Sequence, residues 1–207
     1  MRLYFIRHGE SEANLLQVIS NRGLVHGLTE KGRSQSFSLA QKLAHIPFSR
    51  LFSSPLLRAV QTAEILSNLL AVPVEVTDAL REFDCGVLEG KSDLQSWQIH
   101  IQTRQAWFLH KDWAKRIEGG ESFLDIQARF LPFITALIQE YCHTKSNLLL
   151  VGHGGLFQSV LPLICTNVDF DHVLELPGSN TGIFLTELRP NGLLCLEWDG
   201  LDLAGEA

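Results

Sequence analysis

A histidine between an arginine and a glycine follows the first apolar run of the chain. The tetrad is Arg7-His8-Gly9-Glu10, and residues 3–6 before it are all apolar. A neutral imidazole can attack an electrophile, and a neighbouring guanidinium can neutralise charge on an oxyanion. Gly9 permits a sharp turn and a close approach of the backbone to a ligand. In a parallel α/β sheet such a tetrad lies where ligands bind, beyond the carboxyl end of a strand, although an isolated motif this short also arises by chance.

A second histidine lies in a glycine-rich segment, Gly152-His153-Gly154-Gly155, between an apolar run at residues 147–151 and a helical pattern. The N-terminus of a helix offers unpaired N–H groups and the positive end of the helix dipole to an anion. Gly154 is therefore a candidate anion-binding residue. Taken alone, His153 also fits a buried histidine that is satisfied within a glycine turn.

Two further segments carry charged residues next to predicted strand ends. Arg58 stands in the first turn of a helical pattern that follows Pro55. Cations are slightly disfavoured there, so Arg58 indicates a bound anion that both the helix and the guanidinium attract. Glu82 follows Arg81 and could serve as a general acid. The alternative is an ordinary surface arginine at position 58 and a solvated Arg81-Glu82 pair.

Alternating strand and helix patterns position these segments. Strands are predicted at residues 2–7, 51–54, 73–76 and 147–151, and helices at 29–44, 55–70, 122–142 and 154–161. A break or kink is expected at Pro132. This rhythm predicts an α/β fold with three layers, α/β/α, around a mostly parallel central sheet. Ligands bind beyond the carboxyl ends of such strands, where the candidate residues fall.

The C-terminal part of the chain carries the signature of a hairpin. The turn residues 189–192, Arg-Pro-Asn-Gly, separate two β-rich runs at residues 181–188 and 193–198. We therefore expect a terminal antiparallel hairpin beside the parallel strands.

The chain is expected to form a single domain over residues 1–207, interrupted by one segment of different character. Residues 84–120 hold three of the four tryptophans, together with Lys111, Lys115 and Arg116. One interpretation is a cap insertion, a helical excursion that covers a pocket. The other is an outlying hydrophobic cluster. The three cations could meet a second anionic group or could merely be solvated on a helix.

Composition excludes several classes of protein. No apolar run approaches the roughly 18–20 residues of a membrane span, and the N-terminus lacks the pattern of a secretory signal. A net charge of -6 argues against binding to nucleic acid or to an anionic membrane. The four cysteines are far apart, without a C-x-x-C pair, which favours free thiols and a cytoplasmic location.

Other chemistries fail on their motifs. Residues 86–92 resemble a P-loop, but three residues separate the glycines where four are required. The chain has neither a G-x-S-x-G elbow nor an H-E-x-x-H or cysteine cluster for zinc. We therefore expect no metal ion and no cofactor.

Taken together and in order, these segments resemble the histidine phosphatase superfamily, also called the phosphoglycerate mutase-like family. The matching motifs are R-H-G-E-[ST]-x-x-N at 7–14, L-T-x-x-G at 28–32, S-x-L-x-R-A-x-Q-T-A at 54–63, R-E-x-x-x-G-x-x-E-G at 81–90, G-G-E-S at 119–122 and G-H-G-G at 152–155. One departure is Val25, where many members of the family carry Asp. It bears on substrate contacts of that loop and not on the phosphate pocket.

The resemblance implies a metal-independent phosphomonoester hydrolase that acts on a small phosphorylated metabolite. It implies attack by His8 to give a phosphohistidine intermediate, with Glu82 as the general acid. It further implies that Arg7, Arg58 and His153 neutralise the phosphoryl oxygens, and that Asn14 and Gly154 bind phosphate.

Two alternatives stay open within this resemblance. A phosphoglycerate-type mutase would return the phosphoryl group to a second hydroxyl, and a non-catalytic member would only bind phosphate or act as a scaffold. The G-G-E-S segment and the shortness of residues 201–207 favour the phosphatase branch. Retention of His8, Arg7, Arg58, Glu82 and His153 argues against a scaffold. The physiological substrate and the oligomeric state are not specified.

Overall fold

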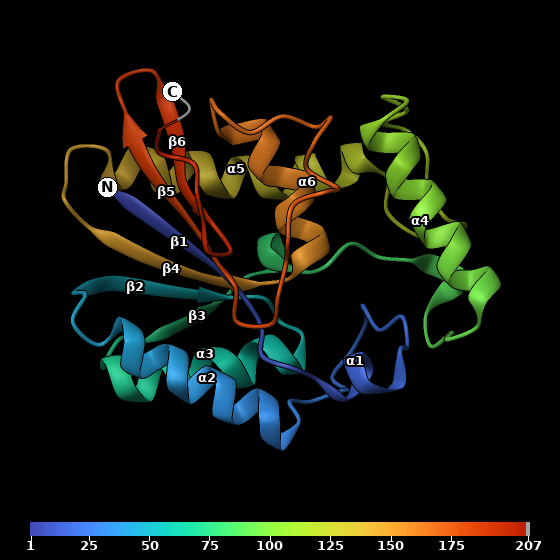
Figure 1. The fold of residues 1–207 in the computed structure, drawn as a ribbon, viewed down its shortest axis with the longest axis horizontal. Coiled ribbons are helices and arrows are strands. Elements are labelled where there is room, and N and C mark those ends of the chain that lie inside the picture. Colours follow the sequence, from blue (N-terminus) through green and yellow to red (C-terminus); the bar gives the residue numbers. More distant parts are fainter. Residues whose placement is uncertain (206–207) are drawn as a thin grey trace.

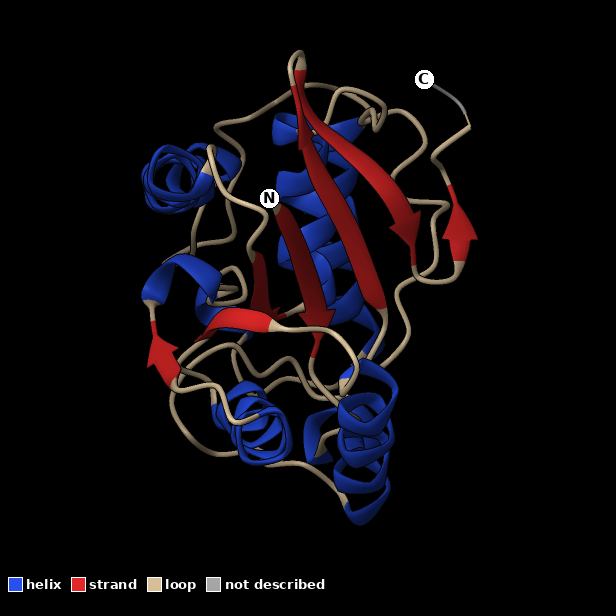
Figure 2. Cartoon of the chain, turned by 90° about the vertical axis from the view of Figure 1, so that its left-hand side faces the viewer, coloured by secondary structure: helices blue, strands red, loops and turns tan. Residues whose placement is uncertain are grey.

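The computed structural model describes residues 1–205, which form one twisted sheet covered by helices on both faces (Figures 1 and 2). The sheet has the strand order β3-β2-β4-β1-β5-β6-β7. Its strands are β1 (Arg2–Arg7), β2 (Phe48–Ser53), β3 (Val74–Val76), β4 (Asn147–Gly152), β5 (Ile183–Arg189), β6 (Gly192–Trp198) and β7 (Leu201–Asp202). The first four in this order pair in parallel, and β5, β6 and β7 pair antiparallel. The predicted α/β fold and terminal hairpin are confirmed, whereas the short strand β7 was not anticipated.

The helices separate into two layers and an outlying element. They are α1 (Glu12–Leu16), α2 (Glu30–Leu43), α3 (Leu57–Leu70), α4 (Leu94–Phe108), α5 (Phe123–Tyr141) and α6 (Gly154–Ile164), with short 3-10 turns η1 (Asp78–Leu80) and η2 (Gly86–Leu88). Helices α2 and α3 cover one face of the sheet, and α5 and α6 cover the other (Figure 1). Within residues 1–205 the structure contains no helix with the length and apolar character needed to cross a membrane.

Strand β1 shows why the sheet lies between two layers. Leu3 and Phe5 pack into the core beneath α5 and α6, while Tyr4 and Ile6 pack into the core above α2 and α3. Side chains alternate between the faces of a strand, so a continuous apolar run must be buried on both sides. Each such side chain stabilises the fold by roughly 1.5–3 kcal/mol through burial.

Of the break or kink expected at Pro132, the structure of helix α5 contradicts the break. The helix runs unbroken from Phe123 to Tyr141. It begins at a capping box, in which the Ser122 N–H donates to the Asp125 carboxylate at 2.8 Å. Buried Phe130 and Ile134 lie on either side of the proline. Because this packing holds both halves in the core, loss of one backbone hydrogen bond does not end the helix.

The segment 84–120 is anchored in the main core. Helix α4 stands at the side of the molecule (Figure 1), yet Trp107 and Phe108 at its end are fully buried among core residues. Trp113 packs on Phe123 of α5 with ring centroids 4.6 Å apart. The interpretation as an outlying cluster is therefore wrong, because these aromatic side chains complete the core beneath α5.

Two glycines bring α2 against the turn after β1. A Cβ on Gly32 would lie 1.9 Å from the Glu10 carbonyl oxygen, and a Cβ on Gly9 would lie 2.4 Å from the Gly32 carbonyl oxygen. The Thr29 hydroxyl caps α2 by accepting from the Gly32 N–H at 3.0 Å. The first turn of α2 is thereby pressed against residues 8–10, and both glycines are required by the closeness of the two backbones.

This contact predicts the effect of Gly32→Ala. Alanine favours a helix over glycine by about 1 kcal/mol, but the clash with Glu10 outweighs this gain. We expect a net loss of about 2 kcal/mol in the free energy of unfolding, measured by urea denaturation. Arg33→Ala, an exposed position on the same helix, is the control and should change stability by less than about 0.5 kcal/mol. Equal stability of the two variants would contradict the proposed contact.

Candidate active site

A cavity of about 280 Å³ opens beyond the carboxyl ends of β1 and β4. Strands β1 and β4 pair in register, with Arg7 opposite Gly152, so the residues that follow them emerge side by side. The cavity is lined by six of the residues predicted from sequence, namely Arg7, His8, Asn14, Arg58, Glu82 and Gly154. His153 is not part of the lining. Four separate segments of the chain are thus brought to one cavity.

His8 lies between a carbonyl oxygen and a guanidinium. The side chain is only 3% exposed. Its Nδ1 is 2.7 Å from the Gly9 carbonyl oxygen, which can only accept a hydrogen bond, so Nδ1 carries the proton. Its Nε2 accepts from the Arg58 Nε–H at 3.0 Å. This geometry selects the tautomer whose lone pair is on Nε2, the atom that can act as a nucleophile.

The surroundings keep this imidazole neutral. Burial, followed by the positive charges of Arg58 and Arg7, holds the pKa of His8 well below its ordinary value. Protonation would place another positive charge beside Arg7 and Arg58, whereas the neutral ring retains its lone pair at neutral pH. The same cations that could bind a phosphoryl group therefore also preserve the nucleophile.

The two arginines remain charged although they are enclosed. Burial lowers the pKa of Arg58 to about 10, so it is protonated at neutral pH. Burial also lowers the pKa of Arg7 from its ordinary value. Arg7 donates from Nη1 to the Gly178 carbonyl oxygen. Arg58 occupies the predicted first turn of α3 and is 6% exposed. Two cations held in a low-dielectric site attract an anion strongly.

His153 lies next to His8. The centroids of the His8 and His153 rings are 5.2 Å apart, and His153 is 0% exposed. Its Nε2 is 2.7 Å from the Ser54 hydroxyl, while its buried Nδ1 has no hydrogen-bond partner within residues 1–205. Burial, then the charge of Arg58, holds the pKa of His153 well below its ordinary value. The ring is therefore neutral and contributes through hydrogen bonding.

Glu82 reaches the cavity from the loop after η1. Its two carboxylate oxygens accept from the Gly155 N–H at 3.0 Å and from the Phe83 N–H at 3.1 Å. Burial raises the pKa of Glu82 in spite of these two bonds and the nearby charges of Arg104 and Arg58. A carboxyl group with a raised pKa holds its proton closer to neutral pH and suits general acid catalysis.

Asn14 and Gly154 complete the predicted set. The Asn14 side-chain oxygen accepts from the Ser11 N–H and hydroxyl, each at 3.0 Å, which leaves its amide N–H groups available to the cavity. A Cβ on Gly154 would lie 3.3 Å from Cδ of Arg7, so glycine lets that arginine lie against the N-terminus of α6.

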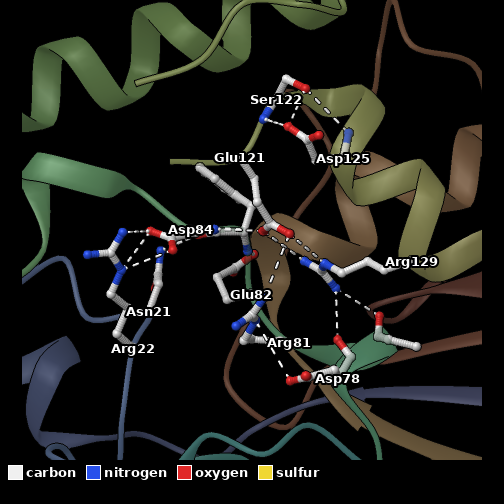
Figure 3. Close-up of polar contacts among 12 residues, drawn as sticks. Asn21, Arg22, Asp78, Arg81, Glu82, Asp84, Glu121, Ser122, Asp125 and Arg129 are labelled. Atoms are coloured by element: carbon white, nitrogen blue, oxygen red, sulfur yellow. Dashed lines mark hydrogen bonds and ion pairs between the residues drawn. The ribbon is translucent and has the colours of Figure 1, made fainter. Parts of the chain in front are cut away.

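The loop that carries Glu82 is fixed by a polar network (Figure 3). Glu121, from the G-G-E-S segment, accepts from Arg129 Nε at 2.9 Å and from the Asp84 N–H at 2.8 Å. Arg129 in turn donates to the Ala79 carbonyl oxygen at 2.9 Å. Glu121 and Arg129 are each only 15% exposed, so their pairing is shielded from water. The network holds residues 79–84 to α5 and fixes the position of Glu82.

Several lining residues were missed from sequence. They are chiefly Ser20 and Asn21, His100 and Arg104 of α4, and Gln158 of α6. Trp97 of α4, one of the tryptophans in the segment interpreted as a possible cap, also lines the cavity. The spacing of residues 97, 100 and 104 on one face of a helix was the available signal. The three cations singled out within 84–120 are absent from the lining. Lys111 pairs with Asp171 at 2.8 Å, and Arg116 with Asp125 at 3.2 Å.

Comparison with known proteins gives consistent relatives. The family described as "Histidine phosphatase superfamily (branch 1)" matches residues 3–200. The adenosylcobalamin/alpha-ribazole phosphatase of Salmonella typhimurium is 32% identical over 167 residues, which cover 80% of this chain and 80% of the Salmonella protein. The glucosyl-3-phosphoglycerate phosphatase of Mycolicibacterium vanbaalenii is 31% identical over 164 residues, which cover 77% of this chain and 72% of that protein. A solved mycobacterial glucosyl-3-phosphoglycerate phosphatase, complexed with VO3, superposes with a TM-score of 0.82 at 25% identity, covering 97% and 99%.

The electrostatics of His8 give a testable outcome. In the wild-type protein, the NMR signals of the His8 ring should remain those of the neutral form at the pH at which an ordinary histidine is half protonated. Arg58→Met removes one of the positive charges that lower this pKa. The pKa of His8 should therefore rise in this variant, while the exposed Arg33→Met leaves it unchanged. Identical titration of His8 in all three proteins would show that Arg58 does not control the charge of the ring.

Proposed function

This chain belongs to branch 1 of the histidine phosphatase superfamily, and on that premise we propose how its own residues hydrolyse a phosphate ester. The enzyme is a phosphatase that acts on a small phosphorylated metabolite through a phosphohistidine intermediate without a metal ion. The observation that carries the assignment of residues is the neutral His8 with its Nε2 lone pair 3.0 Å from Arg58, in the cavity that also holds Glu82.

The first step transfers the phosphoryl group to His8. An oxygen of the incoming phosphate takes the Arg58 N–H, which releases the Nε2 lone pair for attack in line with the ester bond. The P–N bond forms as the P–O bond to the alcohol breaks. Arg7, Arg58 and the N-terminus of α6 at Gly154 stabilise charge on the phosphoryl oxygens, aided by the Asn14 amide. The Gly9 carbonyl stabilises the positive charge that develops at the Nδ1–H.

Glu82 transfers a proton in each of the two half-reactions. It delivers its proton to the departing alcohol oxygen and becomes a carboxylate. It then accepts a proton from the water that attacks phosphorus, the P–N bond breaks, and inorganic phosphate leaves with His8 restored. His153 is a neutral ring that is hydrogen-bonded to Ser54 and packs next to His8, and it supports the position of that ring.

Residues 84–120 act as a cap insertion in the single domain under this proposal. The support is that α4 supplies Trp97, His100 and Arg104 to the lining of the cavity. All four cysteines are free thiols, in keeping with the cytoplasmic location inferred from the sequence.

Covalent catalysis predicts a phosphoryl adduct on His8. Rapid quench with labelled substrate should trap an adduct that is labile in acid and stable in base, also in the presence of a chelator. His8→Ala should abolish it, and His172→Ala, which removes an exposed histidine, should not. An adduct that persists in His8→Ala would refute the nucleophile. A need for added divalent ions would refute the metal-independent mechanism, and an isomerised ester formed faster than inorganic phosphate would indicate a mutase.

General acid catalysis by Glu82 predicts a dependence on the leaving group. Glu82→Gln should slow formation of phosphohistidine about 10²–10⁴-fold with an alkyl phosphate, whose alkoxide needs a proton. With p-nitrophenyl phosphate the loss should be much smaller, because a nitrophenolate leaves nearly unaided. Glu64→Gln, an exposed carboxylate on α3, is the matched control. If single-turnover rates fall equally with both substrates, Glu82 only maintains the structure of the pocket.

A further inference from the structure

Arg104 is an enclosed cation that the proposed chemistry does not use. It lines the cavity from α4 and donates from Nη2 to the Gln158 side-chain oxygen at 2.6 Å. Its guanidinium carbon lies 5.6 Å from the centroid of the Phe108 ring. Its buried Nε has no hydrogen-bond partner, and within residues 1–205 no carboxylate lies within 4.0 Å of this guanidinium. An enclosed guanidinium that leaves its Nε–H unpaired is costly without an anionic partner.

The wall around Arg104 is otherwise uncharged. His100, one turn earlier on α4, stacks on Phe83 with ring centroids 5.1 Å apart. Burial, then the charge of Arg104, lowers the pKa of His100 to about 4, so the ring is neutral at neutral pH. Its buried Nδ1 also lacks a hydrogen-bond partner among the described residues. This side of the cavity therefore offers one positive charge and a free polar atom on an aromatic surface.

The charges of the cavity do not balance when the enzyme is ready to react. Arg7, Arg58 and Arg104 are its cations, and Glu82 is the one carboxylate among its lining residues in the described chain. Glu82 must be protonated to act as a general acid, and it then no longer offsets Arg104. A phosphate dianion compensates the two arginines beside His8. One positive charge remains at the α4 side of the cavity.

We propose that Arg104, held in place by Gln158, binds a second acidic group of the substrate. The substrates are then phosphate monoesters of alcohols that carry a carboxylate or a second phosphate. A planar guanidinium binds either group through paired N–H donors. This inference rests on the proposed function, because it takes the phosphoryl group to lie at His8. Arg104 thereby provides the second anion site for which the sequence had offered Lys111 and Arg116. Those two cations pair with surface carboxylates instead.

Binding of phosphonates tests the inference without requiring turnover. One series consists of phosphonocarboxylates with two to five methylene groups between phosphorus and the carboxylate. The second consists of bisphosphonates of the same lengths, and the third of alkylphosphonates that end in a methyl group. Dissociation constants are measured by isothermal titration calorimetry. For at least one length, the second acidic group should tighten binding about 10- to 100-fold over the methyl compound. The series with the larger gain identifies the preferred acid.

Three variants assign that gain to Arg104. Arg104→Gln should reduce it to about threefold or less. Gln158→Glu changes the side chain little in size and places a carboxylate beside the guanidinium, so it should reduce the gain in affinity equally. If Arg104→Gln does not fold, Gln158→Glu alone tests whether the gain depends on Arg104. Arg116→Gln removes the same charge from the same segment outside the cavity and should retain the full gain.

The outcomes separate this inference from the proposed function. If alkylphosphonates bind and a second acid adds nothing at any length, or if the gain persists in Arg104→Gln or Gln158→Glu, the second anion site is overturned while the phosphatase assignment stands. If no phosphonate binds and no adduct forms on His8, the assignment of the phosphoryl site itself fails. A gain that disappears in both cavity variants and survives in Arg116→Gln establishes the site.

Discussion

The hydrogen bond from Arg58 to Nε2 of His8 is the interaction on which the site depends. A nucleophilic imidazole must stay neutral, yet the group that it attacks must be bound by cations. Placing the guanidinium 3.0 Å from Nε2 meets both needs, because its charge opposes protonation of the ring and attracts the phosphate. The Gly9 carbonyl fixes the proton on the other ring nitrogen. In the proposed mechanism, an oxygen of the substrate phosphate replaces His8 as the acceptor of the Arg58 N–H, which uncovers the lone pair.

Such a cluster of positive charges needs a rigid frame, because like charges repel one another and the rest of the fold must hold them together. The parallel pairing of β1 with β4 fixes His8 beside His153, and the Ser54 N–H donates to the Val151 carbonyl oxygen at 2.9 Å, which places the Ser54 hydroxyl next to His153. On the opposite side, the close contact of Gly32 with Glu10 locks the turn that carries the nucleophile. Burial on both faces of the central strands supplies the stability that offsets the enclosed, incompletely balanced charges.

Glu82 links catalysis to the choice of substrate. The charges of both Arg58 and Arg104 act on its carboxyl group, so the proton that it donates is sensitive to both sides of the cavity. An acidic group bound at Arg104 would shield that cation and favour the protonated form of Glu82, which is the form that the first step requires. Under the proposed mechanism, recognition of a second acid and protonation of Glu82 would thus be coupled through the charge of Arg104.

The sequence by itself determined every strand except β7, the motifs of the candidate site and the local turns, because these follow from short-range patterns. Apolar runs define strands buried on both faces, and an Arg-His-Gly turn or a Thr29 cap is encoded within a few residues. It did not determine that α5 continues through Pro132, nor that Arg104 of α4 meets Gln158 of α6. From the sequence alone, Lys111 and Arg116 were as plausible as Arg104 as cations that line the cavity. Which cation faces the cavity depends on how α4 packs on the core through Trp107 and Phe108. Such contacts join residues distant in sequence, and only the folded chain brings them together.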